Sequence, residues 1–348
     1  MDQLPFGAVA ALVGLGTGMI LGLAARLGSF CTLGAIESAF YGEDQRRARM
    51  WGVVLGTAIT AIYLLEAGGQ IDLQRTIYHQ FDWNPLASII GGLIFGYGMA
   101  LAGNCGFGAL ARFGGGEIRA MVVVVVMGIF GFITLNGPLA ELRVLLFPIT
   151  PAEGAQGLPQ LFTQASGLPM LVAALPVAGL LFFWAFVHAP LRHSPSHVFW
   201  GIAAGLALAG AFWGTSVLER ESMGEVAVSG HTFTAPLGRT LLYLMTSSAG
   251  GLSFSVGSVL GVLSGALLGS FIKREFRWEA CEDPRELGRL VSGAALMGVG
   301  GIVAMGCSIG QGASGFSTLA FSGPVTLAAI IVGALVGLRQ LLQGFQPG

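Results

Sequence analysis

Charged residues are scarce in this sequence. Only 10% of the 348 residues are Asp, Glu, Lys or Arg, and the formal net charge is −1, whereas a soluble domain carries roughly 25% charged residues. Apolar residues make up 54% of the chain, and the mean hydropathy is +0.76. Because so few charges cannot cover a soluble fold of this length, much of the surface must face a lipid bilayer. The balanced charge also argues against a nucleic-acid partner.

Cysteine is rare as well, and it forms no metal or disulfide pattern. The four cysteines, Cys31, Cys105, Cys281 and Cys307, are too few and too scattered for a disulfide framework. They include no Cys-x-x-Cys pair and have no histidine at ligand spacing. Gly-x-Ser-x-Gly, P-loop and His-Glu-x-x-His patterns are also missing. We therefore expect no metal site, no cofactor and no catalytic residue. Cys281, in the charged segment RWEACEDPRE, is interpreted as incidental.

Long apolar segments dominate the rest of the chain. A bilayer core about 30 Å thick needs roughly 20 apolar residues per helix, and this rule predicts an all-α polytopic membrane protein with about nine transmembrane helices. The predicted spans are 7–27, 50–66, 86–103, 119–137, 169–188, 198–218, 250–272, 288–306 and 324–342. Residues 290–338 contain no Asp, Glu, Lys or Arg, so this stretch must hold two spans and the segment between them.

Lys and Arg are divided unequally between the loops. With the N-terminus outside, the cytoplasmic side collects 13 of the 17 basic residues, and the other side holds Arg75, Arg143, Arg220 and Arg239. Because cytoplasmic loops carry an excess of Lys and Arg, this asymmetry predicts an outside N-terminus and a cytoplasmic C-terminus. Arg112 and Arg119 are interpreted as snorkelling to the cytoplasmic surface.

The two halves of the chain resemble each other. Aligning Cys105 with Cys307 places Gly96 on Gly298 and Gly108 on Gly310. Four predicted spans precede the central one and four follow it, so the second half would enter the membrane upside down. The sequence therefore predicts a 4+1+4 inverted repeat. Its parts are a first repeat over 1–140, a linker with the central helix over 141–197, and a second, inverted repeat over 198–348.

Glycine-rich breaks around cysteines interrupt the predicted helices. They are LAGNCGFGALARFGGGE at 101–117 and VAMGCSIGQGASGF at 303–316, and a related break surrounds Cys31. Non-helical backbone at membrane depth must be buried or line a cavity, and paired breaks in corresponding halves point to a transport site. Half-helix N-termini at such breaks carry partial positive charge, which favours an anion.

Thiols at these breaks suit a soft, sulfur-bearing anion better than a purely oxygen-bearing one. A thiol is a weak hydrogen-bond donor, so several of them could form a shallow relay that does not trap the ion. We predict that Cys31, Cys105 and Cys307 form this relay. Neighbours that could support the path are Asn104, Gly106, Ser308, Gln311 and Glu37. A membrane sulfurtransferase or thiol redox protein that handles sulfur or selenium compounds through a persulfide remains the alternative.

Three motifs resemble those of a known family. GSFCTLGAI (28–36), AGNCGFGAL (102–110) and GCSIGQGASG (306–315) resemble, in order and spacing, the cysteine motifs of the YeeE/YedE family of bacterial membrane proteins. This resemblance implies an hourglass-shaped thiosulfate uptake protein of the bacterial inner membrane, with short buried helices pointing inward from both faces. It also implies that the three cysteines pass thiosulfate along through S–H···S hydrogen bonds. A small cytoplasmic sulfurtransferase of the SirA/TusA type, such as YeeD, would be a partner.

Overall fold

The computed structural model of the chain describes residues 5–247, 251–279 and 284–344. The long helices are α1 (Phe6–Leu27), α3 (Arg46–Ala67), α5 (Pro85–Ala102), α7 (Ile118–Leu135), α10 (Met170–Val187), α12 (Pro195–Glu221), α14 (Phe254–Lys273), α15 (Pro284–Val303) and α16 (Ser322–Gly344). The shorter elements are α2 (Thr32–Phe40), η1 (Leu73–Arg75), α4 (Ile77–Gln80), α6 (Gly106–Gly114), α8 (Ala140–Leu146), α9 (Leu158–Ser166), α11 (Ala189–Arg192), α13 (Ala235–Thr246) and the π-helical turn η2 (Gly310–Gly315).

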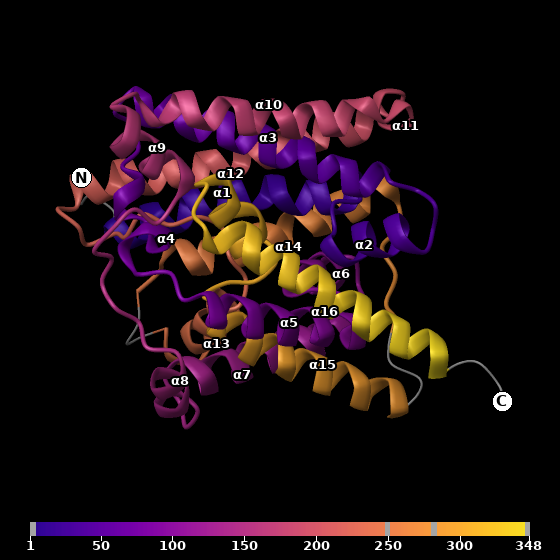
Figure 1. Ribbon diagram of the computed structural model, residues 1–348. Coiled ribbons are helices and arrows are strands. Elements are labelled where there is room, and N and C mark those ends of the chain that lie inside the picture. Colours follow the sequence, from indigo (N-terminus) through magenta and orange to yellow (C-terminus); the bar gives the residue numbers. More distant parts are fainter. Residues whose placement is uncertain (1–4, 248–250, 280–283, 345–348) are drawn as a thin grey trace.

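The long helices lie roughly side by side. In Figure 1, α3 and α10 form the upper edge of the bundle, and α7 and α15 form the lower edge. Among the described residues nine segments are long and apolar enough to cross a membrane, and strands are limited to isolated bridges. The prediction of an all-α polytopic membrane protein with nine spans is therefore confirmed.

Helix packing relates the first half of the chain to the second. Helix α1 packs on α14 and α3 on α12, while α5 packs on α16 and α7 on α15. These pairings correspond across the two halves. The pair of α1 with α14 matches the pair of α12 with α3, and the pair of α5 with α16 matches the pair of α15 with α7. Helices α5 and α15 are antiparallel, since Gly91 lies against Gly300 and Gly98 against Gly293. The breaks that follow α5 and α15 therefore enter the bundle from opposite ends.

The segment around Cys31 has no broken counterpart at the matching register of the second half. Residues 205–222 resemble the segment around Cys31, but α12 continues without a break to Glu221. The chain breaks later, over 222–234, and then forms α13, which was not predicted as a helix. Apolar and small residues throughout 205–218 allow the helix to continue, so the cysteine-like break has no equivalent at that register.

A shared backbone geometry precedes each of the three described cysteines. Ser29, Gly103 and Met305 adopt left-handed φ angles of 56°, 70° and 58°, and each lies two residues before a cysteine. The left-handed residue ends the preceding helix. A residue of this conformation, followed by one linking residue, reverses the chain, so each cysteine begins a new helical turn.

The left-handed conformation at Ser29 predicts a stabilising substitution. Non-glycine residues are strained in this region by roughly 1–2 kcal/mol, and Gly removes the offending Cβ. We expect Ser29→Gly to raise the free energy of unfolding by about 1 kcal/mol, measured as a higher melting temperature of the purified protein. Ser29→Ala, which keeps the Cβ, serves as the control and should give no gain. An equal gain from both variants would contradict the strain argument.

Candidate functional site

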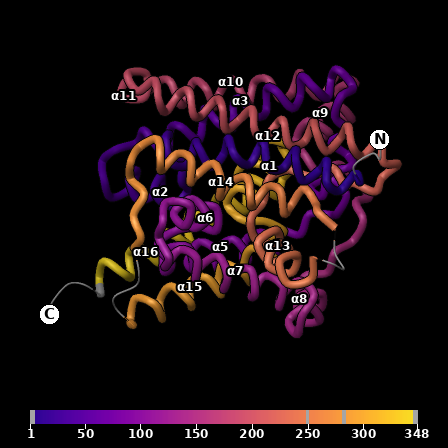
Figure 2. Tube along the Cα trace, turned by 180° about the vertical axis from the view of Figure 1, so that it is seen from behind, coloured from indigo at the N-terminus to yellow at the C-terminus, as the bar shows by residue number. Residues whose placement is uncertain are grey.

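Cys31, Cys105 and Cys307 occupy equivalent local positions. Cys31 is the N-cap of α2, Cys105 is the N-cap of α6, and Cys307 precedes the turn that leads into η2. The carbonyl of each cysteine accepts the N–H four residues ahead, at 3.0, 2.7 and 2.8 Å respectively. Each thiol is therefore held at the first turn of a helical segment inside the bundle. In Figure 2, α6 lies between α14 and α7, near the middle of the molecule.

Two of the sulfur atoms accept backbone hydrogen bonds. The Gly108 N–H donates to Cys105 Sγ at 3.3 Å. Cys307 Sγ accepts two N–H groups, from Gly310 and Phe233, both at 3.3 Å. These bonds occupy sulfur lone pairs and leave the S–H hydrogen free to point elsewhere. The thiol of Cys31 makes no capping hydrogen bond to the described backbone, and its side chain is only half-buried.

A cavity of about 240 Å³ opens beside Cys31, and we call it the basic cavity. Its charged lining residues are Arg26, Arg47, Arg112, Lys273, Glu37 and Glu275. The cations outnumber the carboxylates by two, and neither Arg26 nor Arg47 forms an ion pair with a described carboxylate. The guanidinium of Arg47 lies against Gly34, one helical turn from Cys31. The cavity therefore presents a positive potential that attracts anions to this thiol.

Gly108 lies between the first two thiols. A Cβ at this residue would stand 3.6 Å from Cys31 Sγ, 3.7 Å from Cys105 Sγ and 3.5 Å from the Cβ of Asn104. The two sulfur atoms are consequently neighbours across a glycine that lacks a side chain. Asn104 is buried, and its Oδ1 has no hydrogen-bond partner among the described residues. This oxygen is thus free to accept a hydrogen bond at the same place.

Two hydroxyl groups join Cys105 to the region of Cys307. Thr32 Oγ1 donates to Ser308 Oγ at 3.0 Å, and both residues are buried. Cys105 lies near both hydroxyls and near Cys307. On the far side of Cys307, the Thr232 hydroxyl lies 3.9 Å from its sulfur. Polar groups thus continue from one cysteine to the next.

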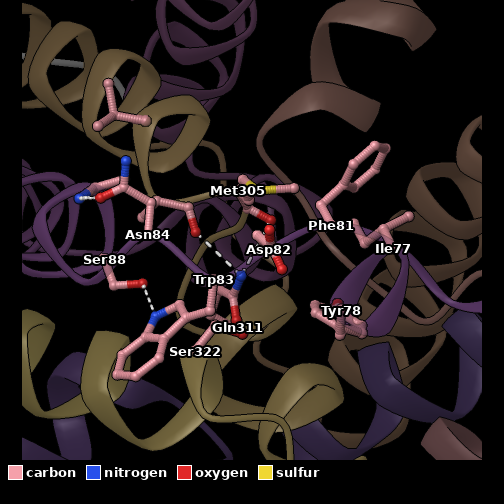
Figure 3. Close-up of a pocket in the computed structure, with 13 residues that line it drawn as sticks. Ile77, Tyr78, Phe81, Asp82, Trp83, Asn84, Ser88, Met305, Gln311 and Ser322 are labelled. Atoms are coloured by element: carbon pink, nitrogen blue, oxygen red, sulfur yellow. Dashed lines mark hydrogen bonds between the residues drawn. The ribbon is translucent and has the colours of Figure 1, made fainter. Parts of the chain in front are cut away.

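A second, much smaller cavity lies at the opposite end of the bundle, and we call it the narrow cavity. Met305 and Gln311, on either side of Cys307, line it together with Tyr78 and Trp83 (Figure 3). Its volume is about 30 Å³, which is room for about two water molecules. The order from the narrow cavity to the basic cavity is therefore Cys307, Cys105 and Cys31.

Aromatic rings enclose the thiols, and sequence reasoning did not identify them. Phe107 lies between Phe30 and Phe233, with ring centroids 5.9 and 5.4 Å away, and all three are buried. Phe30 and Phe107 lie within two residues of a cysteine, and the Phe233 N–H binds Cys307. The proximity of Phe to Cys in GSFC and NCGF was the available signal; nothing in the sequence connected Phe233 to Cys307. These rings exclude water, which strengthens polar interactions at the thiols.

The predicted supporting residues have different surroundings. Ser308 lies on the polar route, by which we mean the hydroxyls of Thr32 and Ser308 between Cys105 and the region of Cys307. Asn104 lies beside Gly108, and Glu37 is exposed in the basic cavity. Gln311 instead ties the broken backbone, because its Nε2 donates to the Ala304 carbonyl at 3.0 Å. Gly106 packs against Met127, where a Cβ would stand 2.7 Å from the Met127 sulfur. Its small size therefore serves close packing.

Arg112 and Arg119 are both expected at the cytoplasmic surface, but their surroundings differ in the structure. Arg112 lines the basic cavity with Cys31, whereas Arg119 forms ion pairs with Glu117, Glu279 and Glu286. A position at the cytoplasmic surface therefore does not fully describe Arg112, which also lines the cavity beside Cys31. Cys281 lies outside the described residues. Among the residues that the structure does describe, no group of three or more His, Cys, Asp or Glu side chains could hold a metal ion.

His231 is a buried histidine near Cys307. It lies in the segment between α12 and α13, with Ser258 Oγ 2.6 Å from Nδ1 and Thr17 Oγ1 2.9 Å from Nε2. Thr17 Oγ1 also donates to the Val13 carbonyl at 2.7 Å, so it must accept a hydrogen from Nε2, and Ser258 donates to Nδ1. Burial lowers the pKa of His231 to about 3, so the ring is neutral.

This buried neutral ring predicts a loss of stability in acid. The unfolded state binds a proton at His231 below about pH 6.5, while the folded state does not until about pH 3. Stability should therefore fall as the pH drops below 6.5, by about 1.4 kcal/mol per pH unit for one such histidine. Melting temperatures between pH 7.5 and 5 would measure this loss. The slope should be shallower in His231→Gln, and an unchanged slope would refute the assignment.

Comparisons with known proteins agree with this geometry. A family model described as sulphur transport matches residues 27–336, a span that takes in all three described cysteines. Two similar proteins, from Spirochaeta thermophila and Escherichia coli, are both named thiosulfate transporter TsuA. Each is 26% identical to this chain. The first alignment covers 92% of this chain and 96% of the relative, and the second covers 92% of each.

Proposed function

Because the chain belongs to the sulphur transport family, we propose that it takes up thiosulfate along a path lined by Cys307, Cys105 and Cys31. The observation that carries this proposal is the position of the three thiols. They lie one after another in space between two cavities at opposite ends of the bundle. The names of the two relatives support thiosulfate as the substrate. The family and both relatives are described by transport, so the chain is a transporter rather than an enzyme.

The thiols act as weak donors to a passing sulfur anion. Backbone N–H groups occupy lone pairs on Cys105 and Cys307, so each S–H can donate to the soft terminal sulfur of thiosulfate. The Ser308 hydroxyl accepts from Thr32 and keeps its own hydrogen for an oxygen of thiosulfate, while the unpaired Asn104 Oδ1 is an acceptor for a thiol hydrogen. The described groups that contact the Cys105 and Cys307 thiols are hydroxyls and backbone N–H groups rather than cations, which keeps these two steps shallow. The cations of the basic cavity then draw the anion out of the path.

An inverted repeat with an hourglass shape is the second part of the proposal. Two observations support it. The helix pairs of the first half correspond to pairs in the second half, and the breaks after α5 and α15 enter the bundle from opposite ends. The proposed parts are 1–140, the linker 141–197 with α10, and 198–348. In this arrangement the basic and narrow cavities are the two funnels, and the cysteines form the waist.

We further propose that the protein lies in the bacterial inner membrane, with its N-terminus outside and its C-terminus in the cytoplasm. The basic residues gathered around the basic cavity support a cytoplasmic position for that end. The narrow cavity would then face outward, and this structure would be closed on the outside. A small sulfurtransferase of the SirA/TusA type would collect thiosulfate sulfur at the basic cavity.

Substitution of the buried thiols tests the path. We expect Cys105→Ala and Cys307→Ala to lower radiolabelled thiosulfate uptake into proteoliposomes at least about tenfold, because losing one hydrogen-bonding step of about 1.4 kcal/mol has that effect. Cys105→Ser keeps a donor but not a soft atom and should remain impaired. Cys281→Ala is the matched control and should transport normally. Sulfate and selenite as competitors measure selectivity, and full uptake by both alanine variants would exclude the thiol path.

A methyl group at Gly108 tests the geometry independently of thiol chemistry. Its contacts would all be of ordinary van der Waals length, so Gly108→Ala should fold normally, with helix propensity adding up to about 1 kcal/mol of stability. The methyl would nevertheless fill the gap between two sulfur atoms and should reduce uptake at least about tenfold. Gly179→Ala, in α10 with open space around it, should transport like the parent. Normal transport by the Gly108 variant would place the path elsewhere.

A further inference from the structure

A third cavity, larger than the basic and narrow cavities, opens on the side of the bundle. This lateral groove has a volume of about 590 Å³ and lies between α2, α3, α10 and α16. Its walls are mostly apolar, and they include Trp51, Leu181, Trp184, Phe316, Leu327 and Ile331. Helix α10 has only 17% of its span buried within the protein, so this flank of the bundle meets the hydrocarbon of the bilayer. Figure 1 shows α3 and α10 above α16, with α2 beside them at one end.

Arg49 lies in the groove without a carboxylate partner among the described residues. Its guanidinium stacks 4.4 Å from the ring centroid of Trp184. It donates to the Trp184 carbonyl and, through Nε and one terminal nitrogen, to Gln45 Oε1. Arginine has five N–H donors, so two remain unused. An oriented cation at the end of an apolar groove matches a phosphate group linked to an acyl chain.

We propose that the lateral groove binds one phospholipid with an anionic headgroup. The phosphate takes the two free donors of Arg49, and one acyl chain lies along the apolar walls toward Phe316. The groove belongs to the same end of the bundle as the basic cavity, because Arg47 lines that cavity two residues before Arg49. Anionic lipids favour sites where basic residues gather between transmembrane helices.

The lipid would contact the helix that carries Cys31. Thr32, Ala35 and Ile36 of α2 line the groove, and Thr32 also donates to Ser308 on the polar route. An acyl chain therefore packs against the first turn of α2 on the face opposite the basic cavity. It fills space that would otherwise let this short helix shift.

Native mass spectrometry of the full-length protein tests lipid binding. Protein in detergent is mixed with phosphatidylglycerol or with phosphatidylcholine of the same acyl chains, and retained lipid is counted. The parent should retain one phosphatidylglycerol in preference to phosphatidylcholine. Arg49→Gln should lower this preference about fivefold. Arg46→Gln is the matched control, because Arg46 is already paired with Asp44 at 2.8 Å, and it should keep the preference.

Filling the groove tests the position of the acyl chain. Ala39→Trp should abolish retention of both lipids, and Ala48→Phe provides a second filling variant if the first does not fold. Equal retention of the two lipids by the parent would overturn the proposal. So would an equal loss in the Arg46 and Arg49 variants, which would indicate general surface charge, or unchanged lipid retention in a folded filling variant.

Discussion

Broken helices inside a bilayer must satisfy their own backbone polar groups, and this requirement organises the centre of the molecule. Lipid offers no hydrogen bonds to a free N–H or carbonyl. At each break a left-handed residue ends one helix and a cysteine starts the next turn. Cysteine sulfur accepts N–H groups at two of the three breaks, and Gln311 binds a carbonyl at one of them. The same bonds that stabilise the breaks hold the thiols in place and leave their hydrogens free.

The opposite directions of α5 and α15 explain how the proposed path would connect the two ends of the bundle. Cys105 follows a helix that runs toward the basic cavity, and Cys307 follows a helix that runs toward the narrow cavity. Both residues lie in the same buried core because each break turns the chain back into the bundle. Charge is unequal along this path: cations gather at one cavity only, and the middle holds thiols, hydroxyls and an amide. On the proposed path, an anion would therefore find its strongest attraction at the basic cavity.

The surroundings of the thiols serve a common purpose, which is to keep the centre dry and α2 in position. Phe30, Phe107 and Phe233 pack around the sulfur atoms, where the low dielectric strengthens weak donors. Helix α2 lies between the basic cavity and the lateral groove. A lipid in that groove would complete the packing on the groove side of this short helix.

Composition and the lengths of the apolar segments determined the membrane class and the nine spans, because hydrocarbon imposes length and polarity limits that are visible residue by residue. The three cysteine motifs could be read directly from the sequence. The cysteines could be selected from the sequence, since glycines and a polar residue beside a thiol are unusual within a span. Tertiary structure alone decided which groups surround them. Arg26 and Arg47 meet at the basic cavity from separate helices, and Phe233 reaches Cys307 from a loop after α12. These contacts join residues far apart in the chain, and only helix packing, which local sequence patterns do not encode, brings them together.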